Sequence, residues 1–185
     1  MVSLERSSLY LLTSAQDGVR FDIDADGDLD QIAWTVSGSD VAFLALDQDG
    51  DGTIASGREL LGRHTLPGPR NGPNALTMLA SDAVAGERRG VIDSRNPLFF
   101  KLLLWTDTNH NAISEHEELR PVEQAVSSVG LGFTRQHRTD RHGNVSRFRG
   151  FVLIRSTAED QVIRTADEDN ERRRSMYDAC LVTER

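Results

Sequence analysis

The sequence predicts a small α+β domain built on paired acidic loops with short strands and helical turns, closed by a C-terminal antiparallel β-sheet. Three observations predict this fold class. Acidic or amide side chains recur at alternate positions ahead of Gly27, Gly52 and Ala112. Short apolar runs flank these loops and favour strands or single helical turns. After Pro121 the loops stop, and partly alternating runs flank a turn, as in an antiparallel hairpin.

The strongest loop lies within Leu46–Leu60, LDQDGDGTIASGREL. Calcium is a hard cation that takes six to eight oxygen ligands at about 2.3–2.6 Å, which one short segment supplies only through a tight turn. Gly52 permits that turn, and we expect Ile54 to enter the core. The alternative is a solvated acidic turn without metal. The expected ligands are the side chains of Asp47, Asp49, Asp51 and Glu59 and the backbone carbonyl of Thr53.

An earlier loop, FDIDADGDLDQIAWTV, connects two expected strands, Val19–Ile23 and Gln31–Val36. Its twelfth position is Ala33, which has no ligand atom, so a helix–loop–helix arrangement is a poor description. We expect instead a D-x-D-x-D-G-x-x-D calcium loop between strands, with an acidic hairpin tip that binds no metal as the alternative. The expected ligands are Asp22, Asp24, Asp26 and Asp30 and the carbonyl of Asp28.

A later loop, WTDTNHNAISEHEELRP, has a carboxylate at its twelfth position but Ala112 in place of the usual glycine. Ser114 and Glu117 match a capping box, which predicts a short helix at the end of the loop. Two neutral amides predict weaker binding than in the Leu46–Leu60 loop. The expected ligands are Asp107, Asn109, Asn111 and Glu118 and the carbonyl of Ile113.

A further segment, residues 82–97, resembles a degenerate loop in which two arginines oppose a cation. Asp22 and Asp47 are 25 residues apart, as are Asp82 and Asp107, which favours a duplicated pair of loops. We expect one domain over residues 1–185, with a first loop pair at 1–65, a second at 75–120 and a C-terminal β part at 121–185. A helix is expected to start at Pro97. The expected C-terminal strands are Gly130–Thr139, Val145–Ile154 and Ser175–Thr183.

The charge distribution excludes some functions. Residues 1–63 contain 12 acidic and 4 basic side chains and so contribute all of the net charge of −8. That balance disfavours binding to nucleic acid and predicts metal-dependent folding of the acidic half. No apolar run is long enough to insert into a membrane, and no signal peptide is visible. Nucleophile, zinc and phosphate-loop motifs are absent, so we expect no enzymatic activity.

Four segments together resemble a known family: FDIDADGDLDQIAWT, AFLALDQDGDGTIASGRELLG, LLLWTDTNHNAISEHEEL, and DRHGN…RFRG…YDACLVT. They resemble EF-hand-like, dockerin-like calcium-binding modules of bacterial secreted, RTX or haemolysin-type, and surface proteins. The likeness runs from Val19 to Thr183, with Ala112 and residues 82–97 as departures. It implies an extracellular or cell-surface location. Some relatives cleave themselves at Asp-Pro bonds, but this sequence contains no such pair.

We therefore predict a calcium-ion binding module whose fold is stabilised or switched by calcium and which has a structural or protein-interaction role. One alternative is a dockerin-like adhesion module, which requires an exposed apolar patch around Leu60–Leu61 or Leu119. Another is a calcium-stabilised accessory domain of a secreted hydrolase, which requires a cleft with a nucleophile or paired carboxylates. The expected partners are calcium ions and a protein, without nucleic acid or membrane insertion.

Overall fold

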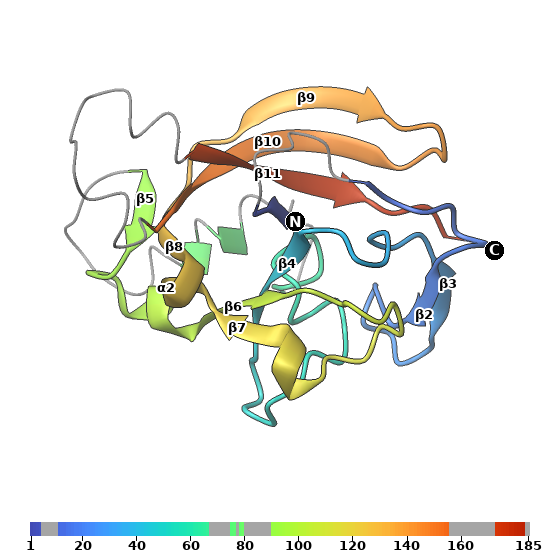
Figure 1. The fold of residues 1–185 in the computed structure, drawn as a ribbon, viewed down its shortest axis with the longest axis horizontal. Coiled ribbons are helices and arrows are strands. Elements are labelled where there is room, and N and C mark those ends of the chain that lie inside the picture. Colours follow the sequence, from blue (N-terminus) through green and yellow to red (C-terminus); the bar gives the residue numbers. More distant parts are fainter. Residues whose placement is uncertain (5–10, 67–74, 77, 80–89, 156–172, 184–185) are drawn as a thin grey trace.

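The computed structural model describes residues 1–4, 11–66, 75–76, 78–79, 90–155 and 173–183. Most of the regular structure is antiparallel β-sheet, which curls into a half-barrel (Figure 1). The α+β prediction was therefore wrong, because the segments between the loops pair as strands and the helices are only a turn or so long. The strands are β1 (Val2–Ser3), β2 (Val19–Phe21), β3 (Asp30–Ile32), β4 (Val41–Leu46), β5 (Val91–Asp93), β6 (Leu102–Trp105), β7 (Leu119–Pro121), β8 (Val126–Gly130), β9 (Thr134–Thr139), β10 (Val145–Ile154) and β11 (Arg173–Cys180), and the helices are η1 (Pro97–Lys101), η2 (His116–Glu118) and α2 (Val122–Ala125).

The large sheet has the order β5-β8-β10-β11-β1-β4-β6-β7, with β9 paired to β10. The short strand β1 joins its two parts, because Val2 pairs with Met176 of β11 on one side and Ala42 of β4 on the other. A separate hairpin pairs β2 with β3, so that Phe21 lies opposite Asp30. The hairpin and the loop after β6 lie at the right of Figure 1, and the loop after β4 projects at its bottom.

Strand β4, with the sequence VAFLAL, is buried on both faces. Because successive side chains of a strand point to opposite faces, Ala42, Leu44 and Leu46 enter one apolar core. Phe43 and Ala45 enter a second core on the other side. This second core contains the aromatic rings of Phe21, Trp34, Phe43 and Trp105, and it lies beneath the acidic loops.

The sequence predicts a helix that starts at Pro97, a single helical turn over residues 56–61 and a short helix over residues 75–80. The structure confirms the first start, corrects the second prediction and describes part of the third. Pro97 begins only the 3₁₀ helix η1, capped by the Asn96 side chain that accepts from the Leu98 N–H at 2.9 Å, and the chain then extends as β6. Residues 56–61 form turns, with the Glu59 N–H donating to the Ser56 carbonyl at 3.1 Å. Helical residues are described at 75–76 and 78–79, and the remainder of that expected helix lies outside the described residues.

The expected C-terminal hairpin is present as β9 and β10, and the expected third strand is present as β11. Gly130, however, belongs to β8, which pairs with the far end of β10. The sequence also predicts a strand over 8–13, a loop over 66–74 and a charged loop over 158–174. These three segments lie partly outside the described residues, and so does the degenerate loop at 82–97, of which half is described. Among the residues that the structure describes, no helix is long and apolar enough to cross a membrane.

Candidate metal centre

The three acidic loops share one backbone conformation. In each, the fourth and sixth residues have positive φ, a left-handed conformation that glycine adopts most readily. The values are 64° and 98° at Ala25 and Gly27, 78° and 84° at Gly50 and Gly52, and 62° and 56° at His110 and Ala112. The replacement of glycine by Ala112 therefore preserves the turn, although the sequence pattern indicated a departure.

The first aspartate of each loop also makes the same hydrogen bond. Its carboxylate accepts from the backbone N–H five residues later, which draws the segment into a ring around the acidic side chains. The donor–acceptor distances are 3.2 Å from Gly27 to Asp22, 3.0 Å from Gly52 to Asp47 and 2.8 Å from Ala112 to Asp107. Three segments with different sequences thus form the same oxygen-lined turn.

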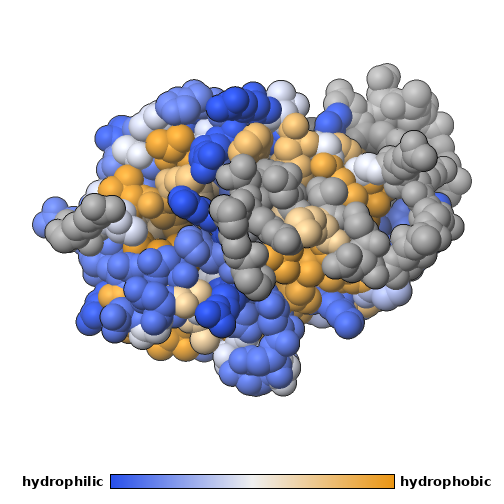
Figure 2. All heavy atoms as spheres, turned by 180° about the vertical axis from the view of Figure 1, so that it is seen from behind, coloured by the Kyte–Doolittle hydropathy of each residue, from blue (hydrophilic) through white to orange (hydrophobic). Residues whose placement is uncertain are grey.

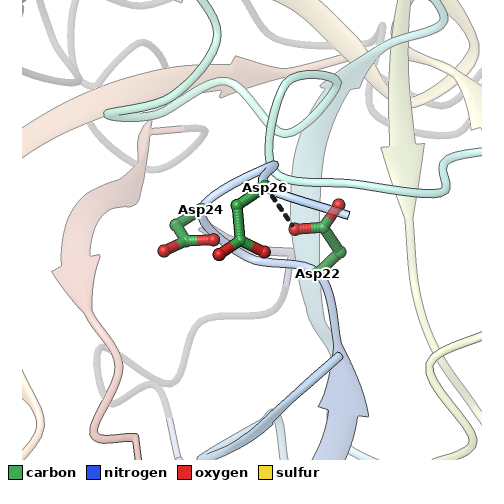
Figure 3. Close-up of side chains that lie close together, drawn as sticks. All are labelled: Asp22, Asp24 and Asp26. Carbon is green, nitrogen blue, oxygen red and sulfur yellow. Dashed lines mark hydrogen bonds between the residues drawn. The ribbon is translucent and has the colours of Figure 1, made fainter. Parts of the chain in front are cut away.

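In the loop between β2 and β3, the carboxylates of Asp22, Asp24 and Asp26 point toward one another (Figure 3), and each offers an oxygen within 4.8 Å of the others. The Asp26 N–H donates to Asp22 Oδ1 at 3.1 Å. Partial burial, and then the negative charges of the neighbouring aspartates, raise the pKa of Asp30. Asp30, the first residue of β3, does not belong to the group formed by Asp22, Asp24 and Asp26. The exposed Asp28 donates its N–H to Asp26 Oδ1 at 2.9 Å.

In the loop after β4, oxygens of Asp47, Asp49 and Glu59 lie within 4.8 Å of one another. Glu59 is only 6 % exposed, and its two oxygens accept from Gln48 N at 3.3 Å and Ala55 N at 2.8 Å. Glu59 therefore reaches the other carboxylates although it is thirteenth rather than twelfth in the loop.

Asp51 makes different contacts. Its Oδ1 accepts from the N–H and the hydroxyl of Thr53 at 2.7 and 2.8 Å. It does not belong to the group formed by Asp47, Asp49 and Glu59. Both Asp51 and Thr53 are exposed. The loop after β4 projects at the bottom of Figure 1, and the surface that projects at the bottom of Figure 2 is hydrophilic.

In the loop after β6, Asp107 and Glu118 are 3 % and 8 % exposed. Indole N–H groups contact both carboxylates: Trp34 Nε1 donates to Asp107 Oδ2 at 2.7 Å and Trp105 Nε1 to Glu118 Oε2 at 3.2 Å. The other oxygen of Glu118 accepts from the N–H and the hydroxyl of Thr108, each at 2.7 Å. Both carboxylates are therefore oriented by the second core.

Glu115 is a candidate ligand that the sequence prediction missed. Its Oε1 accepts from the side-chain amides of Asn109 and Asn111 at 3.2 and 2.7 Å, which leaves both amide oxygens directed elsewhere in the loop. The hydrogen bond from Asn111 is the main cause that lowers the pKa of Glu115. Its position, ninth in the loop, is the one that Asp30 occupies in the loop between β2 and β3, and that spacing could have revealed it.

The predicted capping box at Ser114 was wrong. Helix η2 begins after Glu115 and has no side-chain cap. The Ser114 hydroxyl lies instead in the protein interior, where it accepts from the Ile54 N–H at 2.6 Å. The backbone of Ile113 lies in the same loop, with a 62 % exposed side chain.

The donor set of these loops suits a hard divalent cation. It consists of carboxylate and amide oxygens, the ligands that calcium prefers, with no thiolate and no imidazole among the candidate ligands. His110 lies in the third loop, but its ring nitrogens are 2.9 Å from the Thr35 carbonyl and 3.1 Å from the Asp17 carbonyl. It is therefore engaged by the backbone of another segment.

Comparison with protein families identifies a match to the SPM domain. The model of the SPM domain covers residues 2–167, from β1 to beyond β10 and including all three loops. The chain belongs to the SPM domain family. The match covers most of the chain. The identity of the bound ligand is inferred from the geometry of the three loops.

A cavity of about 560 Å³ opens beside the first loop of this SPM domain. Its lining includes Asp24, Asp30, His64, Asp178 and Cys180. Within the described part of the chain, no hydrogen bond joins Cys180 to a histidine, and the carboxylates in the lining are those of Asp24, Asp30 and Asp178.

Proposed function

We propose that this SPM domain binds calcium in its three acidic loops and that the ion stabilises or switches the fold for a structural or protein-interaction role. The observation that carries the proposal is the shared loop architecture. Three segments place left-handed residues at the same two positions and anchor the first aspartate in the same way. A turn that binds no ligand would not require both features at each of the three sites.

The loop after β4 is the strongest candidate, since three carboxylates converge there and one of them, Glu59, is buried. Two carboxylates with oxygens within 4.8 Å of each other repel when both are ionised. A divalent cation between them attracts both and outweighs that repulsion. The loop between β2 and β3 supplies a second cluster, and the loop after β6 supplies the carboxylates of Asp107 and Glu118, which both accept indole hydrogen bonds. Calcium chemistry here is confined to charge neutralisation and ordering of the chain.

The proposed role follows from linkage. Extracellular calcium modules bind the ion with dissociation constants of about 10⁻⁴–10⁻³ M. A calcium concentration about 100 times the dissociation constant adds roughly 2.7 kcal/mol per site to the free energy of unfolding. Such a domain folds firmly at extracellular calcium levels and loosens at intracellular levels. An extracellular or cell-surface location and a protein partner belong to this proposal.

The adhesion alternative has less support. It needs an apolar patch around Leu60–Leu61 or Leu119, but Leu60 is only 7 % exposed and packs into the second core. Leu61 and Leu119 are partly buried against the two cores. The large exposed hydrophobic side chains of the described residues lie elsewhere: Leu11, Leu29, Phe100 and Ile113.

The test is a calcium titration by calorimetry on chelator-stripped protein, with thermal unfolding measured in parallel with and without the ion. We expect binding at two or three sites and a raised melting temperature. Asp47→Ala with Glu59→Ala should remove the strongest site, whereas Glu123→Gln in α2 should leave the titration unchanged. Absence of both heat and a melting shift in the wild type would refute the proposal.

A further inference from the structure

The three loops contact one another directly. The loop between β2 and β3 meets the end of the loop after β4, where the Gly57 N–H donates to the Asp22 carbonyl at 2.8 Å and Asp22 bridges Ser56. Asp22 is also the first candidate ligand of its loop. Any movement of the chain around Gly57 is therefore transmitted to that residue.

The second and third loops are joined by a buried contact at equivalent positions. Ile54 is the eighth residue of one loop and Ser114 the eighth of the other. The Ser114 hydroxyl accepts from the Ile54 N–H at 2.6 Å and lies 3.4 Å from the Ile54 carbonyl oxygen. Both residues are buried, Ile54 at 1 % and Ser114 at 6 % exposure, so this contact does not compete with water.

The third connection links the β2–β3 hairpin to the third loop. Trp34, two residues beyond β3, is fully buried and donates its indole N–H to Asp107 Oδ2 at 2.7 Å. The next residue, Thr35, offers its carbonyl to the ring of His110 at 2.9 Å. The side-chain orientation of the first ligand of the third loop therefore depends on a residue of the first hairpin.

We propose that the three loops bind calcium as one coupled unit, in which Trp34 and Ser114 are the positioning residues that connect the loop after β6 to the other two. The inference rests on the calcium binding proposed above. A cation that orders one loop also fixes the groups that the neighbouring loops contact. Binding of a second ion then costs less conformational entropy. Coupling of this kind is reciprocal between sites.

The third loop should respond most to this coupling. Only two of its four predicted side-chain ligands are carboxylates, the other two being Asn109 and Asn111. Its affinity therefore depends on how well Asp107 and Glu118 are oriented before the ion arrives. Both carboxylates receive indole hydrogen bonds, which makes the loop a direct optical reporter: terbium, which replaces calcium at oxygen sites, is excited through a nearby tryptophan.

The experiment combines tryptophan-sensitised terbium luminescence with calcium calorimetry on the full chain. The test variant is Asp49→Asn with Asp51→Asn, because both residues are exposed and an asparagine oxygen can still accept the backbone hydrogen bonds that these two carboxylates accept. A matched control, Glu117→Gln with Glu123→Gln, removes the same charge nearer in sequence to the third loop. We expect the test variant to weaken terbium binding at the third loop by about five- to a hundredfold and the control to weaken it far less.

A second arm leaves all candidate ligands in place. Trp34→Phe keeps a ring in the core but removes the donor to Asp107, and Phe43→Leu disturbs the same aromatic cluster without removing a hydrogen bond to a loop. We expect Trp34→Phe to abolish the positive cooperativity of calcium binding and Phe43→Leu to retain it.

The outcomes separate the two proposals. Absence of calcium binding by the wild type would refute the function and the coupling together. Calcium binding with independent sites, or equal losses in test variant and charge control, would overturn the coupling alone. If Trp34→Phe fails to fold, the comparison of the Asp49/Asp51 variant with its charge control still decides the matter.

Discussion

Gly57 lies so close to the carbonyl oxygen of Ile23 that a Cβ at Gly57 would stand 1.8 Å from it. Backbone atoms form this contact, so a side chain has no rotamer that avoids it. Gly52, five residues earlier, differs: its φ is +84°, but a Cβ there would meet no atom within 4 Å. One glycine is required for close approach, and the other only for its conformation.

We therefore predict unequal costs for Gly57→Ala and Gly52→Ala. The left-handed conformation costs a residue with a Cβ about 1–2 kcal/mol, and Ala112 already occupies the equivalent place at φ 56°. Gly52→Ala should thus lower the free energy of unfolding by about that amount. Gly57→Ala should cost more than about 3 kcal/mol, because the first and second loops must separate. Urea unfolding of both variants tests this, and equal losses would contradict it.

The side chains of Ile54 and Ile113 give a second prediction. Ile54 is 1 % exposed and belongs to the second core, as the sequence predicted, whereas Ile113 in the third loop is 62 % exposed. Ile54→Ala should cost about 2–5 kcal/mol through lost burial and the cavity that remains. Ile113→Ala should change stability by no more than about 0.5 kcal/mol. Denaturant midpoints measure both, and a costly Ile113→Ala would show an unrecognised contact.

The loops were predictable from sequence because their geometry is local. Alternating acidic residues and a glycine at the sixth position predict the turn from a segment of about a dozen residues. The hydrogen bonds around Asp47 follow from that turn. The hairpin of β9 and β10 was predictable for the same reason. Local patterns did not reveal Ser114, whose partner Ile54 is 60 residues away.

The sheet was not predictable in the same way. Strand β1 has two residues, and its partner in β11 lies more than 170 residues along the chain, at Met176. No local pattern records such a pairing. The continuous burial of Val41–Leu46 was visible as an apolar run, but only the structure shows that alternate residues serve two separate cores. The helical interpretation failed because pairing with distant strands overrode weak local preferences.

Selectivity among cations gives a third prediction. Magnesium requires nearly octahedral geometry at about 2.0–2.1 Å and releases its water reluctantly, whereas calcium accepts irregular cages. The loop with Asp47, Asp49 and Glu59 combines exposed and buried carboxylates and is one residue longer than the standard spacing. Its donor set is therefore irregular. At equal concentration, calcium should raise the melting temperature of chelator-stripped protein more than magnesium does. Thermal unfolding in either ion measures this, and a larger shift with magnesium would contradict it.

The last prediction concerns pH and Asp178 of β11. Burial raises the pKa of Asp178, an effect that the N-terminal ammonium and Arg147 oppose. A carboxyl whose pKa is higher in the folded than in the unfolded state binds more protons when folded. Its contribution to stability therefore falls as the pH rises from its ordinary value of 3.8 through its folded pKa.

Asp178→Asn removes this titration and should raise the free energy of unfolding at pH 7. The gain should shrink as the pH is lowered through the folded pKa of Asp178, because the wild-type carboxyl is then neutral as well. Urea unfolding of both proteins between pH 3 and pH 8, in chelator, measures the difference, with Glu123→Gln as a control of equal charge. A gain that is independent of pH would mean that the asparagine acts through packing, since only the ionised carboxylate is penalised by burial.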